Sequence, residues 1–375
     1  MKPWLLATAL LGVGLLVSVS AQAPATDPLI RAMHDEIDRS RKLTVPNLET
    51  PYFIEYLLDE NESFNVSATL GGLTARRRDK FRNLDVNVRV GDYKFDNTNY
   101  IGSDFVFGSR YDLERFPLEN SNPVLRRYLW LATDTAYKSA IEAISRKRAA
   151  LRNLTVSDQL NDFAHAQPVH IIKDFQKLTL DEDAWANRVR TLSAIFDRYP
   201  DVEASGIEFS AGDGGYYLVN SEGTEVRVPD RTAFLRARAV ARAPDGMGVR
   251  DAVAFQAVEA GRLPGDAELT SKIQTLAQNV VALAKAPKGE DYSGPVLFEG
   301  VAGPQVFAEV LGRNLSLTRR PVMEPGRNGT FAVSEFDGRI GARVLPESFN
   351  VVDDPTLKEW RGRPLFGTYE VDREG

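Results

Sequence analysis

Apolar residues recur along the chain with two different periods. In four long stretches they return every three to four positions, which is typical of one face of an α-helix. The predicted helices span residues 27–43, 123–151, 185–199 and 266–286. The second is the strongest prediction, because Pro123 can open a helix and the basic residues 146–148 complement the dipole at its end.

Elsewhere apolar residues alternate with polar ones or form short runs, which indicates β-strands. These strands cover residues 52–58, 63–70, 84–90, 206–210, 215–219, 225–228 and 234–243. We expect a loop at 59–62 and a glycine-rich turn at 212–215, each of which would close a hairpin. Further turns are expected at 71–72, 220–224 and 244–248. Together these elements predict an α+β fold, with an N-terminal antiparallel sheet and packed helices.

The stretch 292–312 changes its period within a few residues. A turn leads into the apolar run 296–298, which predicts a strand. From Pro304 onward the apolar residues have helical spacing, and Gly312 is typical of a helix end. A strand should therefore feed directly into a helix, with Glu299 at the junction.

This stretch resembles the TldD/PmbA family, also called modulator of DNA gyrase. Its active members are metalloproteases with the motif His-Glu-three residues-His at the start of this helix, where both His bind zinc and the Glu is the general base. In this chain Phe298 stands at the first His position, Glu299 at the Glu and Gly303 at the second His. The resemblance implies that the catalytic base is kept and that both zinc ligands are lost, because phenylalanine and glycine have no side-chain donor.

The resemblance runs from about residue 50 to the last residue, with 216–224 and 351–375 as its other specific parts. After a signal peptide at 1–23, which has a pattern of its own, the resemblance implies a family-like α+β region at 24–285 and the beginning of a β-rich, peptidase-like domain at 286–375. The family continues beyond this point, where active members have a further metal ligand. We therefore expect a fragment or a split gene product with unpaired strand edges, and Phe298 packed in the core behind Glu299.

Composition narrows the function classes. The net charge of -6 and the pI near 5.4 argue against a nucleic-acid binder. The absence of cysteine excludes disulfides, zinc ribbons and thiol nucleophiles. Only three histidines are available as metal ligands: His34 is expected at the surface or at its boundary with the core, and His165 and His170 flank Pro168 and share no helical face. No cofactor is expected in this chain, whereas active family members bind zinc.

The first residues have the pattern of a secretory signal peptide. Lys2 precedes an apolar run at 5–19, and cleavage is expected after Ala21 or Ala23. The run is short for a membrane span, although an uncleaved N-terminal anchor is the alternative interpretation. We expect an exported protein, periplasmic or extracellular, without a stable membrane anchor.

Three functional hypotheses stay open at this point. The resemblance favours a PmbA-like subunit that binds no metal, pairs with a TldD-like zinc-binding partner or with itself, and binds peptide or unfolded protein by strand addition. A second hypothesis is an active peptidase, with Glu299 as base and Asp353, Asp354 and Asp372 as ligands of a hard ion such as calcium or manganese. A third is a cell-envelope binding module with no enzymatic activity.

Overall fold

The computed structural model describes residues 27–42, 44–101, 116–152, 160–316, 319–323, 334–339 and 341–375. The predicted signal peptide at 1–23 lies outside these residues and stays a prediction. Within the described residues, no helix is long and apolar enough to cross a lipid bilayer. One large sheet with packed helices confirms the α+β class.

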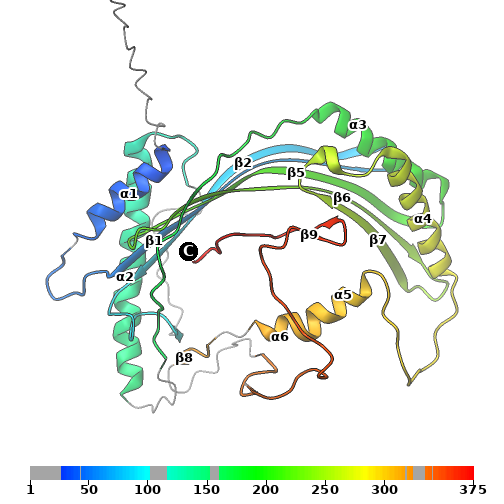
Figure 1. Cartoon of the computed structure of the whole chain (residues 1–375). Coiled ribbons are helices and arrows are strands. Elements are labelled where there is room, and N and C mark those ends of the chain that lie inside the picture. Colours follow the sequence, from blue (N-terminus) through cyan, green and yellow to red (C-terminus); the bar gives the residue numbers. More distant parts are fainter. Residues whose placement is uncertain are drawn as a thin grey trace, which may run out of the picture.

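A six-stranded sheet forms the centre of the molecule and curves along its length (Figure 1). The strand order is β2-β1-β5-β6, and both β7 and the short β4 pair with the far side of β6. The strands are β1 (Phe53–Thr69), β2 (Gly72–Arg89), β4 (His170–Ile172), β5 (Val202–Asn220), β6 (Glu225–Arg242) and β7 (Gly248–Ala257). All pairs are antiparallel except that of β4 with β6. Strands of this length accumulate twist, so the sheet arches instead of lying flat.

Two predicted hairpin loops are wrong, because they lie inside long strands. Residues 59–62 continue β1 and residues 212–215 continue β5, and the two segments pair with each other. The polar residues are tolerated there because charged partners are at hand, as where Arg82 lies 2.8 Å from Glu60. Gly214 marks a close backbone approach instead of a turn, since a Cβ there would lie 2.1 Å from the Glu60 carbonyl oxygen.

The other three predicted turns are confirmed and connect β1 to β2, β5 to β6 and β6 to β7. In the middle turn, the side-chain oxygen of Asn220 accepts hydrogen bonds from the Glu222 and Thr224 amides at 3.0 and 3.1 Å. Gly223 has a φ of 106°, which only glycine adopts readily. Turn chemistry that could be read from the sequence therefore sets the register of β5 against β6.

Four helices cover the convex face of the sheet and confirm the four predicted helices to within a few residues (Figure 1). At one end lie α1 (Pro28–Ser40) and α2 (Asn122–Leu151). At the other end lie α3 (Glu182–Ser193), its 3-10 extension η1 (Ala194–Arg198) and α4 (Asp266–Ala284), with the short 3-10 turn η2 (Ala260–Arg262) before α4. Asp27 and Asp181 cap α1 and α3, each by accepting an amide hydrogen bond.

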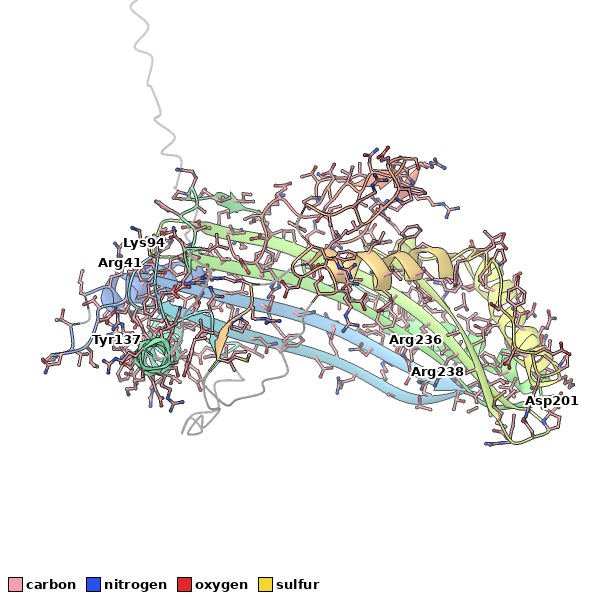
Figure 2. The ribbon with its side chains drawn as sticks, turned by 90° about the horizontal axis from the view of Figure 1, so that it is seen from below. Arg41, Lys94, Tyr137, Asp201, Arg236 and Arg238 are labelled. Atoms are coloured by element: carbon pink, nitrogen blue, oxygen red, sulfur yellow. The ribbon has the colours of Figure 1, made fainter. Side chains whose placement is uncertain are left out.

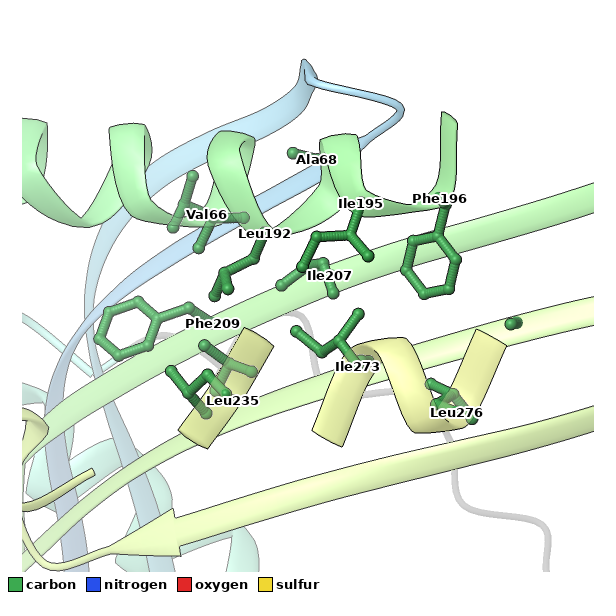
Figure 3. Packing of buried hydrophobic residues seen from close by; sticks show 14 of the residues in the cluster. Val66, Ala68, Leu192, Ile195, Phe196, Ile207, Phe209, Leu235, Ile273 and Leu276 are labelled. Carbon is green, nitrogen blue, oxygen red and sulfur yellow. The ribbon is translucent and has the colours of Figure 1, made fainter. Parts of the chain in front are cut away.

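Each pair of helices packs over its own apolar cluster. Under α3 and α4, the Phe209 ring stacks on Trp185 with 3.8 Å between centroids. Ile273 and Leu276 of α4 complete this cluster (Figure 3). Under α1 and α2, the Tyr56 hydroxyl bonds the Thr133 hydroxyl at 2.6 Å. The opposite, concave face has no such helical cover (Figure 1).

Residues 286–375 contain few regular elements among those described. A short helical run comprises α5 (Ala302–Phe307), a π-helical turn η3 (Ala308–Gly312) and α6 (Arg313–Leu315), so it ends three residues after the expected stop at Gly312. The remaining strands have two residues each: β9 (Glu359–Trp360) pairs with β10 (Arg363–Pro364), and β3 (Tyr100–Ile101) pairs with β8 (Val322–Met323). The division into domains at residue 285 stays a prediction.

The strand predicted at 296–298 does not form, and the prediction that Phe298 packs in the core is wrong. Phe298 is 51% exposed. The run from α5 to α6 lies apart from the large sheet (Figure 1), and among the described residues no strand pairs with 296–298.

Candidate functional site

The residues at the family's motif positions lie on the surface. Glu299 is exposed, and Gly303 follows it in the first turn of α5. A Cβ on Gly303 would lie 3.5 Å from the Phe298 carbonyl oxygen, so the two positions aligned with the histidines of the motif are close in space. Neither position supplies a donor atom to a metal. The residues present therefore do not fit the zinc ion of the family's active members.

The acidic residues proposed as substitute ligands do not gather around Glu299. Asp354 caps its own turn, accepting hydrogen bonds from the Thr356 hydroxyl and amide at 2.7 and 3.0 Å, and these bonds hold the pKa of Asp354 below its ordinary value. Asp372 accepts a bond from the Glu374 amide. Asp353 is exposed. Among the described residues, no three potential metal ligands converge.

Each of the three histidines faces a carboxylate, and His34 and His170 face the same one. His34 Nε2 lies 2.6 Å from Glu225 Oε2, and His34 is half-buried beside β6, which agrees with the boundary position that the sequence allowed. His170 Nδ1 lies 3.8 Å from the other oxygen of Glu225, whereas His165 lies 3.6 Å from Glu222. The structure does not bring His165 and His170 to a shared partner.

The concave face of the sheet is the most extended polar surface that the strands build. Cross-strand pairing places alternate residues of neighbouring strands on this one face. From β1 come Asp59, Asn61, Ser63, Asn65 and Ser67; from β5 come Tyr216, Gly214, Gly212, Ser210 and Glu208; from β6 come Asp230, Thr232, Phe234, Arg236 and Arg238. Hydroxyl, amide and charged groups thus form a shallow surface rich in hydrogen-bonding groups.

One half of this face is covered by residues 369–375, which have no regular secondary structure (Figure 1). The Tyr216 hydroxyl donates a hydrogen bond to the Val371 carbonyl oxygen at 3.0 Å. The Val371 side chain is buried against Leu218 and Val226. Arg373 Nη2 lies 2.5 Å from Asp59 Oδ2. The face thus holds a non-regular segment through a main-chain group, an apolar side chain and a charge.

Glu55 lies under this covered half and has an unusual environment. It is 8% exposed, and its Oε2 has no hydrogen-bond partner among the described residues. Burial raises the pKa of Glu55 to about 7, although Arg89 favours the charged form. The charge of Glu374 adds to the rise. A carboxyl group in this state changes its charge near neutral pH.

The other half of the concave face is open and basic. A recess of about 450 Å³ is lined there by Asn65, Ser67, Arg77, Glu208, Ser210 and Phe234. Arg236 and Arg238 rise from β6 beside it (Figure 2). Both approach one carboxylate, with Glu208 oxygens 2.6 Å from Arg236 and 3.4 Å from Arg238.

A buried ionic network near the end of α2 supports the fold instead of a site. Lys147 is 2% exposed and donates to the Asp96 and Thr98 carbonyl oxygens and to Asp162 Oδ2, at 3.0, 2.7 and 2.5 Å. Burial raises the pKa of Asp162, but the hydrogen bonds from Lys147, the Asp96 amide and Asn99, together with the charge of Lys147, outweigh it, so the net pKa is lowered. The sequence placed Lys147 among the basic residues near the end of the helix, and only the tertiary contacts show that it is buried.

A scan against protein-family models gives no match, and a search of curated proteins gives none either. Among solved structures, the chain is similar to a protein from Thermotoga maritima described as a candidate modulator of a DNA gyrase, with 12% identity, a TM-score of 0.39, and coverage of 68% of this chain and 48% of that one. TldE from Thermococcus kodakarensis gives 12% identity and a TM-score of 0.37, covering 66% and 47%.

A similarly described protein from Bacteroides thetaiotaomicron gives 12% identity and a TM-score of 0.35, covering 68% of this chain and 48% of that one. The chain spans about half the length of these three structures. Their names are those of the family that the sequence resembles. At this identity the likeness concerns the arrangement of strands and helices alone.

Proposed function

We propose that the chain is a TldD/PmbA-type subunit that binds peptide or unfolded protein on its concave face and leaves the metal chemistry to a zinc-binding partner. The observation that carries the proposal is the seating of residues 369–375 on that face. The face holds this segment in the way a peptide site holds a ligand, with one main-chain bond, one apolar pocket and one charge pair.

The concave face suits ligands of varied sequence. The Tyr216 hydroxyl binds a carbonyl oxygen, which every peptide has. The rows of serine, threonine and asparagine side chains offer both donors and acceptors without a fixed geometry. A protein that assists proteolysis of unfolded substrates needs this tolerance.

Strand addition, the binding mode expected from the sequence, has one suitable edge. Within the described residues, the outer edges of β2, β7 and β4 have no strand partner, and β4 has only three residues. β2 has the basic residues Arg76, Arg77, Arg78, Lys80 and Arg82 along it, which discourage edge pairing. β7 has only Arg250 and Asp251 as charged residues. A peptide that adds a strand would therefore extend the sheet beyond β7.

The motif region supports a subunit that binds no metal itself. Phe298 and Gly303 offer no ligands, and the exposed Glu299 belongs to no group of three potential metal ligands among the described residues. The catalytic water would have to be activated in the partner. We also propose that this assembly works outside the cytoplasm, on the basis of the signal-peptide pattern at 1–23.

The test combines the chain with a zinc-binding homologue that has the intact His-Glu-three residues-His motif. Fluorescein-labelled casein, an unfolded protein, serves as the probe for binding and for cleavage. We expect the isolated chain to bind casein without cleaving it, to hold sub-stoichiometric metal after gel filtration, and to accelerate cleavage by the homologue. Stoichiometric zinc in the isolated chain, or cleavage that is lost in Glu299→Gln, would overturn the proposal.

A further inference from the structure

The concave face is divided by charge into two halves. In the covered half, Asp59 and Asp230 face the same guanidinium, that of Arg373. In the open half, Arg236, Arg238 and Arg250 project from β6 and β7 on the same side of the sheet. The acidic half is thus occupied by a basic side chain, and the basic half is open to a ligand.

The three arginines are close to one another because of the strand register. Arg236 and Arg238 are two positions apart on β6, which places their side chains on one face about 7 Å apart. Arg238 pairs with Ala252, so Arg250 is its diagonal neighbour on β7. Gly206 is opposite Arg238 on β5, and a Cβ there would lie 3.4 Å from Arg238 Nε. The missing side chain leaves room for the guanidinium to lie flat across the sheet.

One carboxylate serves this group from within the chain. Glu208 contacts both Arg236 and Arg238, whereas Arg250 is exposed and forms no ion pair with a described residue. Three positive charges against one negative charge leave an excess of two. A guanidinium has five N–H donors, so Arg236 and Arg238 can share Glu208 and still have donors free for the carboxylate of a ligand.

An exposed aromatic ring lies at the edge of this group. Phe234 is 38% exposed and lies two positions before Arg236 on the same face. It lines the recess of about 450 Å³ together with Ser210 and Asn65, which are hydrogen-bonded to each other at 2.7 Å. An apolar side chain could pack on this ring while a neighbouring carboxylate reaches the arginines.

We infer that Arg236, Arg238 and Arg250, together with Phe234, form a subsite for an acidic side chain flanked by an apolar one. We call these four residues the basic subsite. The inference rests on the proposed function, because it assigns a substrate class to the same peptide-binding face. The same face already binds one side chain of opposite charge, because Asp59 in its covered half holds Arg373. The ligand of the basic subsite is therefore an acidic, partly apolar peptide.

The experiment uses two fluorescein-labelled peptides of equal length. One contains repeated Glu-Phe pairs, and the other has Gln in place of every Glu. Fluorescence anisotropy measures both with the wild-type chain and with a double variant, Arg236→Gln with Arg238→Gln. The control double variant, Arg190→Gln with Arg262→Gln, removes the same charge from α3 and η2. Circular dichroism confirms that each variant is folded, and Arg250→Gln alone provides a milder second test.

We expect the Glu peptide to bind the wild type at least about tenfold more tightly than the Gln peptide, with the preference weakening as salt screens the charges. The preference should disappear in the subsite variant and persist in the control. If both peptides bind equally, or if the preference survives loss of both arginines, the inference is wrong and the proposed function stands. If neither peptide nor labelled casein binds the wild type, the proposed function itself fails.

Discussion

Arg373 Nη2 lies 2.5 Å from Asp59 Oδ2, although 314 residues separate the two in the sequence. The contact ties the segment 369–375 to the middle of β1, and Val371 is buried two residues before it. Both partners of the ion pair are substantially exposed, so the pair itself contributes at most about 1 kcal/mol. Burial of Val371 should contribute more, and it makes the apolar contact the better target for displacing the segment.

Displacing the segment should open the covered half of the concave face to other ligands. Val371→Asp places a charge against Leu218 and Val226, and we expect the segment to detach while the sheet stays folded. Affinity for fluorescein-labelled casein should then rise several-fold. The matched control is Val352→Asp, at a valine that is 82% exposed, which should leave affinity unchanged. Equal affinity in both variants would mean that residues 369–375 do not compete with ligands.

Glu55 should make stability depend on pH near neutrality. Its folded-state pKa of about 7 exceeds the ordinary value of 4.5, so the folded chain retains a proton that the unfolded chain has lost between these values. Stability from this group therefore falls as the pH rises from 4.5 through 7, by at most about 3 kcal/mol.

Glu55→Gln removes this dependence. Urea unfolding at about pH 5 and about pH 8 gives the difference in unfolding free energy between the variant and the wild type at each pH. This difference should shift in favour of the variant by roughly 2 kcal/mol from the lower to the higher pH. A constant difference between the two proteins across this range would show that Glu55 is ionised normally in the folded chain.

The buried ion pair between Lys147 and Asp162 should contribute strongly to the free energy of unfolding. Lys147→Met leaves Asp162 buried with its principal cation lost, which should lower the free energy of unfolding by about 3–5 kcal/mol. Lys138→Met, on the same helix, breaks only the exposed pair with Asp134 and should cost less than about 1 kcal/mol. Urea denaturation of both variants makes the comparison, and similar losses would contradict the burial described for Lys147.

The aromatic core and the motif region should respond very differently to truncation. Phe209→Ala removes the ring stacked on Trp185 and should cost about 3–5 kcal/mol. Phe298→Ala should change stability by no more than about 0.5 kcal/mol because the ring is exposed. Thermal or urea unfolding distinguishes these cases. A large loss of unfolding free energy in Phe298→Ala would show that Phe298 is packed in the core, as the sequence predicted, and not exposed.

Regular periodicity made much of the fold predictable. The apolar stripe of α2 and the Asn220 turn could be read locally, because helix faces and turn chemistry depend on nearby residues. The continuity of β1 through residues 59–62 could not be predicted from the local sequence. A polar strand segment between two apolar clusters has the same composition as a loop, and only pairing with β5 distinguishes them.

The candidate site was only partly accessible from the sequence. Resemblance directed attention to Phe298, Glu299 and Gly303, whose side chains proved to be exposed or unable to bind metal. The arginines of β6 had a local signal, since Arg236 and Arg238 alternate with alanine and leucine along the predicted strand 234–243. The pairing of Arg373 with Asp59 had no signal in the sequence, because no local pattern links positions so far apart.

The most direct test of peptide binding on the concave face uses the fact that the chain has no cysteine. Thr232→Cys on the concave face and Ser271→Cys on α4 each accept one environment-sensitive fluorophore. On titration with unlabelled casein, we predict a saturable change in fluorescence from the label at position 232 and none from that at position 271. No change at 232, or equal changes at both positions, would contradict a peptide site on this face.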